Sequence, residues 1–327
     1  MPIQPNPQAQ PIRRVSPLSI QRPSPLPELL TQFAPFTAVL SLLERVAPTG
    51  APVLIVGEPG TGKTLLARAI HAASRRGGAL VEVDASALPA DLLDLELFGC
   101  DPTAREAGKR SGALEVGTHG TVLIDEIAGV GPRTQAKLLA AISKGSFIRS
   151  GGKRRIEFTA RLISTTSHPV GPMARDGRFD PELLDLLRTA YVELPPLRDR
   201  RTDIPLLAQQ FCVQFGAARE VRLSAEAVGV LEHHDWPGNV RELRSVVERL
   251  ASTAKQEITG ADVSLILNSA AGVGSPMRLH ELERRHILSV LQQTNWHQGR
   301  AAAQLGISSK TLYRKIREYG FERPSSG

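Results

Sequence analysis

Eight consecutive residues have the types and spacing that bind the phosphates of a nucleotide. They are Gly57-Glu58-Pro59-Gly60-Thr61-Gly62-Lys63-Thr64, which follow an apolar segment and precede a helix-prone one. Glycines let successive backbone N–H groups turn toward an anion, and the N-terminus of a helix adds partial positive charge. Lys63 can reach the outer phosphates, and the Thr64 hydroxyl can bind Mg²⁺. The run therefore predicts a nucleoside triphosphate site and disfavours a glycine-rich turn without a ligand.

Two adjacent carboxylates, Asp125 and Glu126, follow the apolar segment 121–124. Asp125 can hold Mg²⁺ beside Thr64, and Glu126 can polarise the water that attacks the terminal phosphate. Two acids at the end of a strand are often only solvated. The catalytic interpretation of this pair therefore depends on the phosphate-binding run.

The elements that must position these groups follow from the hydrophobic pattern. Strand-like runs alternate with helical stretches, at residues 53–56, 80–83, 121–124, 160–165 and 191–194. This alternation is typical of an α/β fold in which a parallel sheet is flanked by helices. Beyond residue 198 only amphipathic helices are expected, which indicates a helical lid. We expect an α/β subdomain at 29–197, a lid at 198–267, a linker at 268–276 and a proline-rich disordered tail at 1–28.

Composition limits the class of protein. The chain has 327 residues, of which 41% are apolar, and its two cysteines cannot build a disulfide framework. No apolar run is long enough for a membrane span and no secretory leader is evident, so a cytoplasmic protein without a membrane partner is expected. The net charge is +7. Residues 278–323 hold nine Lys or Arg against four Asp or Glu, which favours a nucleic-acid partner.

The C-terminal segment, residues 277–323, predicts an all-α helix-turn-helix. Alanine-rich residues 300–305 precede Gly306, which suits a left-handed turn, and Ser308, which suits a helix N-cap. In the helix that follows, Leu312, Ile316 and Tyr319 share one face. The opposite face and its surroundings supply the candidate contacts to double-stranded DNA, which are Arg300, Ser309, Lys310, Thr311, Tyr313, Arg314 and Arg317. A small packing domain with a solvated basic face is the alternative.

Several motifs stand in the order seen in bacterial enhancer-binding proteins, the AAA+ ATPases of the NtrC family that activate sigma-54 RNA polymerase. They are Glu96-Leu97-Phe98-Gly99, Asp125-Glu126, Gln135-Ala136-Lys137-Leu138-Leu139, Glu193-Leu194-Pro195-Pro196-Leu197-Arg198-Asp199-Arg200, Asp203-Ile204-Pro205-Leu206-Leu207 and Trp236-Pro237-Gly238-Asn239-Val240-Arg241-Glu242-Leu243. The chain resembles this family over about residues 29–319, and its end resembles the Fis-type domain.

The resemblance implies several properties. It implies a P-loop NTPase of the AAA+ fold that binds ATP at the subunit interfaces of a ring, commonly a hexamer. It implies that Arg241 senses the nucleotide phosphates from the lid, and that Asp84 occupies the position of an asparagine that steers the catalytic glutamate. It also implies a dimer through the long helix that precedes the helix-turn-helix. RNA polymerase or a sigma factor would be the protein partner.

Three departures separate the chain from this pattern. Residues 100–110 replace the loop that contacts sigma-54, without its Phe-Thr pair. Asp180 and Leu186 stand where the family places two arginines that act on the neighbouring subunit's nucleotide, although Arg175, Arg178 or Arg188 can substitute after a local shift. Ser167 replaces the usual sensor asparagine.

These features together favour a sequence-specific DNA-binding transcriptional regulator. Its AAA+ domain is expected to bind ATP and Mg²⁺ and to self-assemble, with weak or absent hydrolysis and without conventional sigma-54 activation. The alternative is an active sigma-54-dependent activator ATPase. An AAA+ motor that only tethers to DNA is disfavoured, because the DNA domain resembles the family's regulatory one.

Overall fold

The computed structural model describes residues 31–101, 110–216, 221–253, 256–270, 283, 286–291, 294, 296–319 and 321. The chain divides into two compact units, Met1–Ile266 and Leu267–Gly327, which are described separately below. Three sequence predictions fall wholly or mainly outside the described residues. They are the proline-rich tail, most of residues 100–110, and most of the linker 268–276.

The first unit is built on five parallel strands in the order β2-β3-β6-β1-β7. The strands are β1 (Val53–Val56), β2 (Leu80–Asp84), β3 (Thr121–Asp125), β6 (Arg161–Thr166) and β7 (Ala190–Glu193). Each of the five predicted strands is confirmed to within one residue at either end. Because β6 lies between β3 and β1, the carboxyl ends of these three strands meet side by side at one edge of the sheet.

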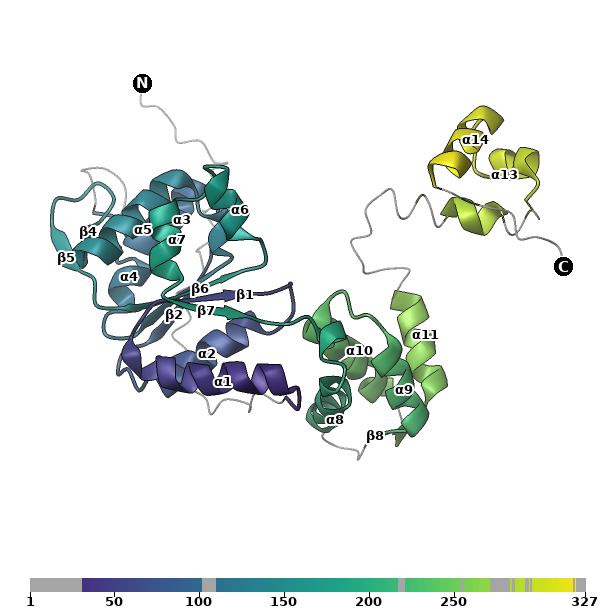
Figure 1. Ribbon diagram of the computed structural model, residues 1–327, viewed down its shortest axis with the longest axis horizontal. Helices are drawn as coiled ribbons and strands as arrows, with labels where there is room; N and C mark the ends of the chain where they lie inside the picture. Colours follow the sequence, from purple (N-terminus) through teal and green to yellow (C-terminus); the bar gives the residue numbers. More distant parts are fainter. Residues whose placement is uncertain are drawn as a thin grey trace, which may run out of the picture. The chain divides into compact units, whose positions relative to one another are not determined.

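Helices cover both faces of this sheet (Figure 1). On one face lie α1 (Ala34–Val46) and α2 (Lys63–Ala73), and on the other lie α3 (Ala90–Phe98), α4 (Ala113–Val116), α5 (Pro132–Lys144), α6 (Val170–Arg175) and α7 (Pro181–Leu187). Successive side chains of a strand point to opposite faces. Leu54 accordingly packs into the core beneath α3, α5 and α7, whereas Ile55 packs against α1 and α2. This alternation confirms the α/β architecture.

Shorter elements connect these layers. They are three 3₁₀ turns, η1 (Ala47–Thr49), η2 (Ile127–Gly129) and η3 (Leu197–Asp199), and a two-stranded hairpin of β4 (Ser146–Ile148) and β5 (Arg155–Glu157). Arg161, at the start of β6, forms hydrogen bonds with backbone carbonyls at and just beyond the C-terminal end of α1. Its buried guanidinium donates to the carbonyls of Val46, Ala47 and Ala51. Burial lowers the pKa of Arg161 to about 10.

The predicted helical lid comprises α8 (Asp203–Phe215), α9 (Ala225–His233), α10 (Asn239–Thr253) and α11 (Gly260–Ala270), with a small parallel pair of β8 (Arg222–Leu223) and β9 (Glu257–Ile258). Asp203, at the start of α8, is fully buried and attaches the entrance of α1 to the lid. Its carboxylate accepts hydrogen bonds from the Thr31 hydroxyl and from the backbone N–H groups of Gln32 and Phe33. The sheet and the lid therefore share polar contacts as well as the chain connection.

The second unit contains helical residues 286–291, α13 (Gln298–Gln304) and α14 (Ser309–Glu318). Its core combines Ile287, Val290 and Leu291 with Ala301, Ala302, Leu312 and Tyr319. The first three of these belong to the segment that precedes the helix-turn-helix, through which the resemblance implied a dimer. The structure places them inside the unit's own core. Within the described residues, no helix is both long enough and apolar enough to span a bilayer.

Candidate nucleotide site and DNA-binding face

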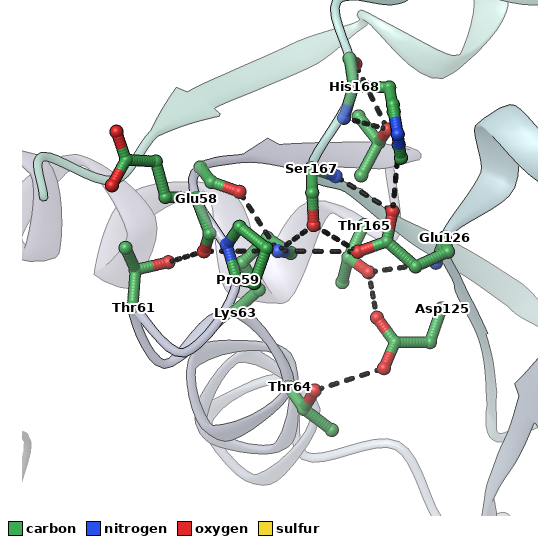
Figure 2. Close-up of polar contacts among 12 residues, drawn as sticks. Glu58, Pro59, Thr61, Lys63, Thr64, Asp125, Glu126, Thr165, Ser167 and His168 are labelled. Atoms are coloured by element: carbon green, nitrogen blue, oxygen red, sulfur yellow. Dashed lines mark hydrogen bonds and ion pairs between the residues drawn. The ribbon is translucent and has the colours of Figure 1, made fainter. Parts of the chain in front are cut away.

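The predicted phosphate-binding run forms the loop between β1 and α2 (Figure 2). Gly60 and Gly62 have φ angles of 81° and 107°, which glycine adopts without strain. The buried Lys63 amine donates to the Gly57 carbonyl at 2.9 Å and to the Ser167 hydroxyl at 2.8 Å. It also lies 3.4 Å from Glu126 Oε1. The loop therefore brings a cation to the carboxyl edge of the sheet, beside the acidic pair.

Asp125 ends β3 and Glu126 follows it, at the same edge of the sheet. Asp125 accepts a hydrogen bond from the Thr64 hydroxyl at 3.3 Å and a short one from the Thr165 hydroxyl. Glu126 has a φ of 56°, a left-handed conformation that is uncommon for a residue with a side chain. Such strain concentrates at functional sites, where the surrounding structure holds the residue in place. Figure 2 shows both carboxylates turned toward the phosphate-binding loop.

Ser167, directly after β6, holds the Glu126 carboxylate. Its backbone N–H donates to Glu126 Oε2 at 2.8 Å, and its hydroxyl makes a short hydrogen bond to Oε1. Burial alone raises the pKa of Glu126. The hydrogen bonds from Ser167 and the charge of Lys63 outweigh that effect, so the pKa lies below its usual value. Glu126 is therefore ionised at neutral pH and held in a fixed orientation.

Asp84, the residue expected by resemblance to steer the glutamate, is engaged elsewhere. It is exposed, and its carboxylate accepts hydrogen bonds from the backbone N–H and the hydroxyl of Ser86. Among the described residues, the polar partners of the Glu126 carboxylate are Ser167, Lys63 and the more distant His168. In this structure Ser167, and not Asp84, holds the Glu126 carboxylate.

The oxygen donors at this edge fit a magnesium ion. Thr64 Oγ1 and Asp125 Oδ2 lie side by side, and hydroxyl and carboxylate oxygens are the ligands that Mg²⁺ takes. No cluster of three or more His, Cys, Asp or Glu that could hold a metal occurs within the described residues. The two oxygens therefore suit an ion that takes its remaining ligands from nucleotide phosphates and water, as Mg²⁺ commonly does.

The lid contacts the phosphate-binding loop through a group that we call the lid latch, consisting of Glu58, Arg198 and Asn239. Arg198 forms a bidentate pair with the Glu58 carboxylate at 2.6 and 2.8 Å. Asn239, at the start of α10, is fully buried and has a φ of 54°. Its amide donates to Glu58 Oε2 and to the Pro59 carbonyl, both at 3.1 Å, and its oxygen accepts from the Leu197 N–H at 2.8 Å.

Arg241 lies on the same side of the lid, close to the phosphate-binding loop. Its backbone N–H donates to the Gly60 carbonyl at 3.3 Å, and its side chain is exposed. A methyl group placed on Gly60 would lie only 2.2 Å from the carbonyl oxygen of Gly238. The loop and the lid therefore touch backbone to backbone at this point, and only glycine permits the approach.

The two positions expected to hold arginine fingers lie at the two ends of α7. Asp180 is the N-cap of this helix, and its carboxylate accepts hydrogen bonds from the N–H groups of Glu182 and Leu183. Leu186 is partly buried in the last turn. Arg175, Arg178 and Arg188 are each partly or fully exposed nearby, and Arg178 pairs with Asp176 at 3.1 Å.

In the second unit, the structure places six of the seven candidate DNA contacts on its exposed surface. The exposed residues are Arg300, Ser309, Lys310, Tyr313, Arg314 and Arg317. Thr311 is only partly exposed, and its hydroxyl lies 2.8 Å from that of Ser308. Ser308 caps α14 by accepting from the Thr311 N–H at 3.1 Å, and Gly306 has a φ of 67°, as the sequence predicted. The basic face of α14 is therefore available to a ligand.

Sequence reasoning did not identify Asn239, Arg198 or the contact between Ser167 and Glu126. Asn239 stands inside a motif from which only Arg241 was singled out. The signal for Asn239 is its place between Gly238 and a helical segment, where a left-handed residue with a polar side chain is typical. No local signal predicts that Arg198 and Ser167 meet residues of the phosphate-binding loop and of β3, because those contacts arise from the order of strands.

Comparison with known families gives three matches along the chain. The sigma-54 interaction domain matches residues 29–193, the AAA+ ATPase lid domain residues 198–272, and the bacterial regulatory protein Fis family residues 278–319. Among curated proteins, the regulatory protein AtoC of Escherichia coli is 36% identical over 85% of this chain and 64% of its own length. The transcriptional regulatory protein ZraR of Escherichia coli is 38% identical over 85% of this chain and 66% of its own length.

Solved structures give a consistent picture. The crystal structure of NtrX from Brucella abortus in complex with ADP has a TM-score of 0.68 and 31% identity, and the match covers 90% of this chain and 69% of NtrX. A complex of the same protein with ATP gives a TM-score of 0.65. RuvB from Thermotoga maritima, at 16% identity and a TM-score of 0.51, shares the fold alone. The chain thus spans about two thirds of the length of the relatives that it matches.

Proposed function

The chain belongs to the family of sigma-54 interaction domain regulators with an AAA+ lid and a Fis-type helix-turn-helix, and on that premise we propose a specific role for it. It is a DNA-bound transcriptional regulator that uses ATP and Mg²⁺ as an assembly ligand. It hydrolyses ATP weakly or not at all, and it does not activate sigma-54 polymerase in the usual way.

Nucleotide binding is supported by the juxtaposition of four groups at one edge of the sheet. Lys63 and the loop N–H groups suit the phosphates, whereas Thr64 and Asp125 suit the metal ion. When bound, Mg²⁺ neutralises phosphate charge and fixes the orientation of the phosphate chain. Arg241 and the lid latch bring the lid to the same loop. A bound nucleotide is therefore sensed by both parts of the first unit.

The observation that carries the proposal is the use of Asp180 as a helix cap. Its carboxylate is committed to the N-terminus of α7, where an anion is favourable and a guanidinium is not. Leu186, at the second finger position, has no charge to offer. An arginine finger accelerates phosphoryl transfer by about 10³ to 10⁵-fold. A site without one retains its affinity for the nucleotide and loses most of its turnover.

Weak turnover also follows from the engagement of Glu126. In an active site a general base must be within hydrogen-bond reach of the attacking water. Here the Ser167 N–H and hydroxyl occupy one lone pair on each carboxylate oxygen, and Lys63 draws on the same group. The lowered pKa of Glu126 makes it a weaker base than an unperturbed glutamate.

The protein partner is proposed from the loop at residues 100–110. This segment reads Cys100-Asp101-Pro102-Thr103-Ala104-Arg105-Glu106-Ala107-Gly108-Lys109-Arg110 and lacks the Phe-Thr pair by which the family contacts sigma-54. We therefore propose that the protein represses transcription, or that it acts on RNA polymerase that carries another sigma factor. The helix-turn-helix supplies the DNA contact, through Arg314 and its neighbours on α14.

A working sigma-54 activator is the second candidate, and one observation favours it. Arg188 is exposed directly after α7, two residues beyond Leu186, and its guanidinium lies 5.4 Å from the centre of the Tyr191 ring. Stacking of this kind holds a guanidinium in place. In a ring, Arg188 would be the replacement finger from the neighbouring subunit.

Two measurements on the full chain separate these candidates. In the first, assembly is followed by sedimentation with ATP, with a non-hydrolysable ATP analogue and with ADP. The proposal requires equal assembly with ATP and the analogue, and none for Lys63→Ala. In the second, transcription from a bound promoter is reconstituted with sigma-54 polymerase. Transcripts that depend on both sigma-54 and hydrolysable ATP would contradict the proposal and support the second candidate.

A further inference from the structure

The β4–β5 hairpin presents three consecutive cations, Lys153, Arg154 and Arg155, which we call the hairpin tip. All three are exposed. None of them has an ion pair or a side-chain hydrogen bond to another described residue, although most other charged groups of this region are paired. Figure 1 shows the hairpin beside α5, on the side of the sheet opposite α1 and α2. The tip is therefore an unneutralised positive feature at the margin of the first unit.

A buried ion pair holds the turn that joins β4 to β5. The Arg149 side chain is only 4% exposed, and it contacts Glu115 with Nε at 3.0 Å and Nη2 at 2.6 Å. Its Nη1 donates to Asp101 at 2.8 Å. Because hydrogen bonds from a guanidinium to two carboxylates are strong and directional, the strands cannot rotate freely. The tip cations therefore follow a turn segment that is fixed to the rest of the unit.

A second polar group ties the hairpin to α3 and α5. The Ser150 hydroxyl donates to Asp94 at 2.7 Å, and the Lys137 amine contacts the same carboxylate at 2.7 Å. The Ser150 carbonyl accepts from the Asp101 N–H at 3.1 Å. Three carboxylates that face the turn, those of Asp94, Asp101 and Glu115, are thus paired with Lys137 or Arg149. None of these pairs involves a cation of the hairpin tip.

We propose that the hairpin tip binds the phosphate backbone of double-stranded DNA, as a second DNA contact in addition to α14. Three extended residues span about 10 Å. A DNA duplex presents one negative charge per about 1.7 Å of its axis, so a segment of this length faces several phosphates. Contacts of this kind position a protein on a duplex without reading its sequence.

The composition of the surface favours DNA over an acidic protein partner. Cores of protein interfaces are enriched in aromatic residues and depleted in lysine. The exposed apolar residue at the hairpin is Ile148, which is paired with Arg155 across the two strands. A single exposed aliphatic side chain does not make a docking patch. The three residues of the hairpin tip present positive charge and form no apolar pocket. Such a surface suits a polyanionic ligand such as DNA.

The proposal depends in part on the proposed DNA-binding role of the second unit. Once α14 holds a duplex, the DNA is present at high effective concentration for the rest of the same chain. A weak, sequence-independent contact in the first unit then contributes to the total affinity. Without the second unit, three cations alone would give only weak binding at physiological salt.

The test measures how DNA affinity depends on salt, with the full chain in the presence of Mg²⁺ and ATP. The probe is a random-sequence duplex longer than the footprint of the helix-turn-helix. The variant is K153Q/R154Q/R155Q. The matched control is R45Q/R75Q/R249Q, which removes three exposed arginines of the first unit and changes the net charge equally. A further variant, R314A/R317A, removes the basic face of α14.

Each phosphate contact contributes about 0.9 to the slope of log affinity against log salt. The tip variant should therefore lose a slope of about 2.7 per bound protomer, whereas the control keeps the wild-type slope. Between about 50 and 200 mM salt this difference amounts to roughly 40-fold in affinity. Thermal unfolding and ATP binding should be the same for the wild type, the tip variant and the control, because the tip side chains make no ion pair or side-chain hydrogen bond with a described residue.

Three results would overturn the inference. An unchanged slope in the tip variant would show that the cations do not meet phosphates. An equal loss in the control would show only a general effect of net charge. A normal slope together with weaker binding to RNA polymerase would assign the tip to an acidic protein surface. If instead the wild type failed to bind any duplex, or bound it independently of Arg314 and Arg317, the proposed function itself would fail.

Discussion

The Ser167 hydroxyl and backbone N–H both hold the carboxylate of Glu126, and the same hydroxyl accepts a hydrogen bond from Lys63 at 2.8 Å. One small side chain therefore connects the phosphate-binding loop to the residue that would activate water. The connection is possible because β6 lies between β1 and β3 in the sheet. It fixes Glu126 without help from Asp84.

This contact predicts a specific pH dependence of stability. The pKa of Glu126 is lowered in the folded chain, so its contribution to the free energy of unfolding is present above the unfolded value of 4.5 and is lost as the pH falls through the lower folded value. Glu126→Gln should be less stable than the wild type near pH 6, and the difference should shrink as the pH is lowered below 4.5. Urea unfolding of both proteins at several pH values between about 3 and 6 measures this difference in the free energy of unfolding.

Ser167→Ala should reduce the difference in stability that the charge of Glu126 causes. In that variant the Glu126 carboxylate keeps only the backbone N–H of residue 167 and the Lys63 amine as close partners. Ser167→Thr, which keeps the hydroxyl, is the matched control. A pH profile of unfolding that is identical in wild type, Glu126→Gln and Ser167→Ala would contradict the role given to Ser167.

Removal of the Asn239 side chain should uncouple the lid from the phosphate-binding loop. Asn239→Ala deletes three hydrogen bonds of a fully buried residue and leaves Ala in a left-handed conformation. Each buried partner left without its hydrogen bond costs about 1–3 kcal/mol. Asn239→Gly removes the same bonds without the backbone strain, so it isolates their effect. Both variants should bind ATP at least ten-fold more weakly, as measured by isothermal titration calorimetry; unchanged affinity in both would refute the latch.

Two glycines of the phosphate-binding loop provide a matched pair. Gly60 and Gly62 both have positive φ, and a side chain in that conformation costs about 1–2 kcal/mol. A methyl group on Gly60 would also lie 2.2 Å from the Gly238 carbonyl, whereas one on Gly62 would have no neighbour within 4 Å. Gly60→Ala should therefore destabilise the lid well beyond Gly62→Ala in urea unfolding. Equal effects would show that the backbone approach is not maintained in solution.

Adjacent residues on α14 should behave differently toward DNA. Arg314 is exposed, whereas the Lys315 amine is held by Glu283 at 2.7 Å and by the Tyr319 hydroxyl at 3.3 Å. Arg314→Ala should weaken binding to a selected operator by about 1–3 kcal/mol. Lys315→Ala should lower the thermal stability of the second unit and leave the salt dependence of DNA binding unchanged. The opposite pattern, measured by fluorescence anisotropy and calorimetry, would mean that α14 presents another face to DNA.

Local patterns were sufficient to predict the strands, the phosphate-binding loop and the helix-turn-helix. Val53–Val56 is an apolar run bounded by proline and glycine, so it forms a buried parallel strand. Gly306 and Ser308 take the turn and cap conformations that their side chains favour. In each case the deciding interaction lies within a few residues of the chain, where a sequence pattern can report it.

Contacts between distant residues could not be predicted in this way. Asn239 and Glu58 are 181 residues apart and meet only once the lid has folded over the sheet. The net charge of the whole chain was equally uninformative for Lys153, Arg154 and Arg155, because it does not show which cations are paired with a carboxylate in the folded structure. Burial of Ile287, Val290 and Leu291 in their own unit also depended on tertiary packing that periodicity alone does not reveal.

The central claim is that the site holds ATP without the cation needed to cleave it. Steady-state release of phosphate by the assembled full chain, at saturating ATP and Mg²⁺, tests it most directly, with Lys63→Ala as the blank and equilibrium binding measured on the same sample. The account predicts clear ATP binding by the wild type and a turnover that cannot be distinguished from the blank. Turnover near the value of about 1 per second at which typical enzymes begin would contradict it.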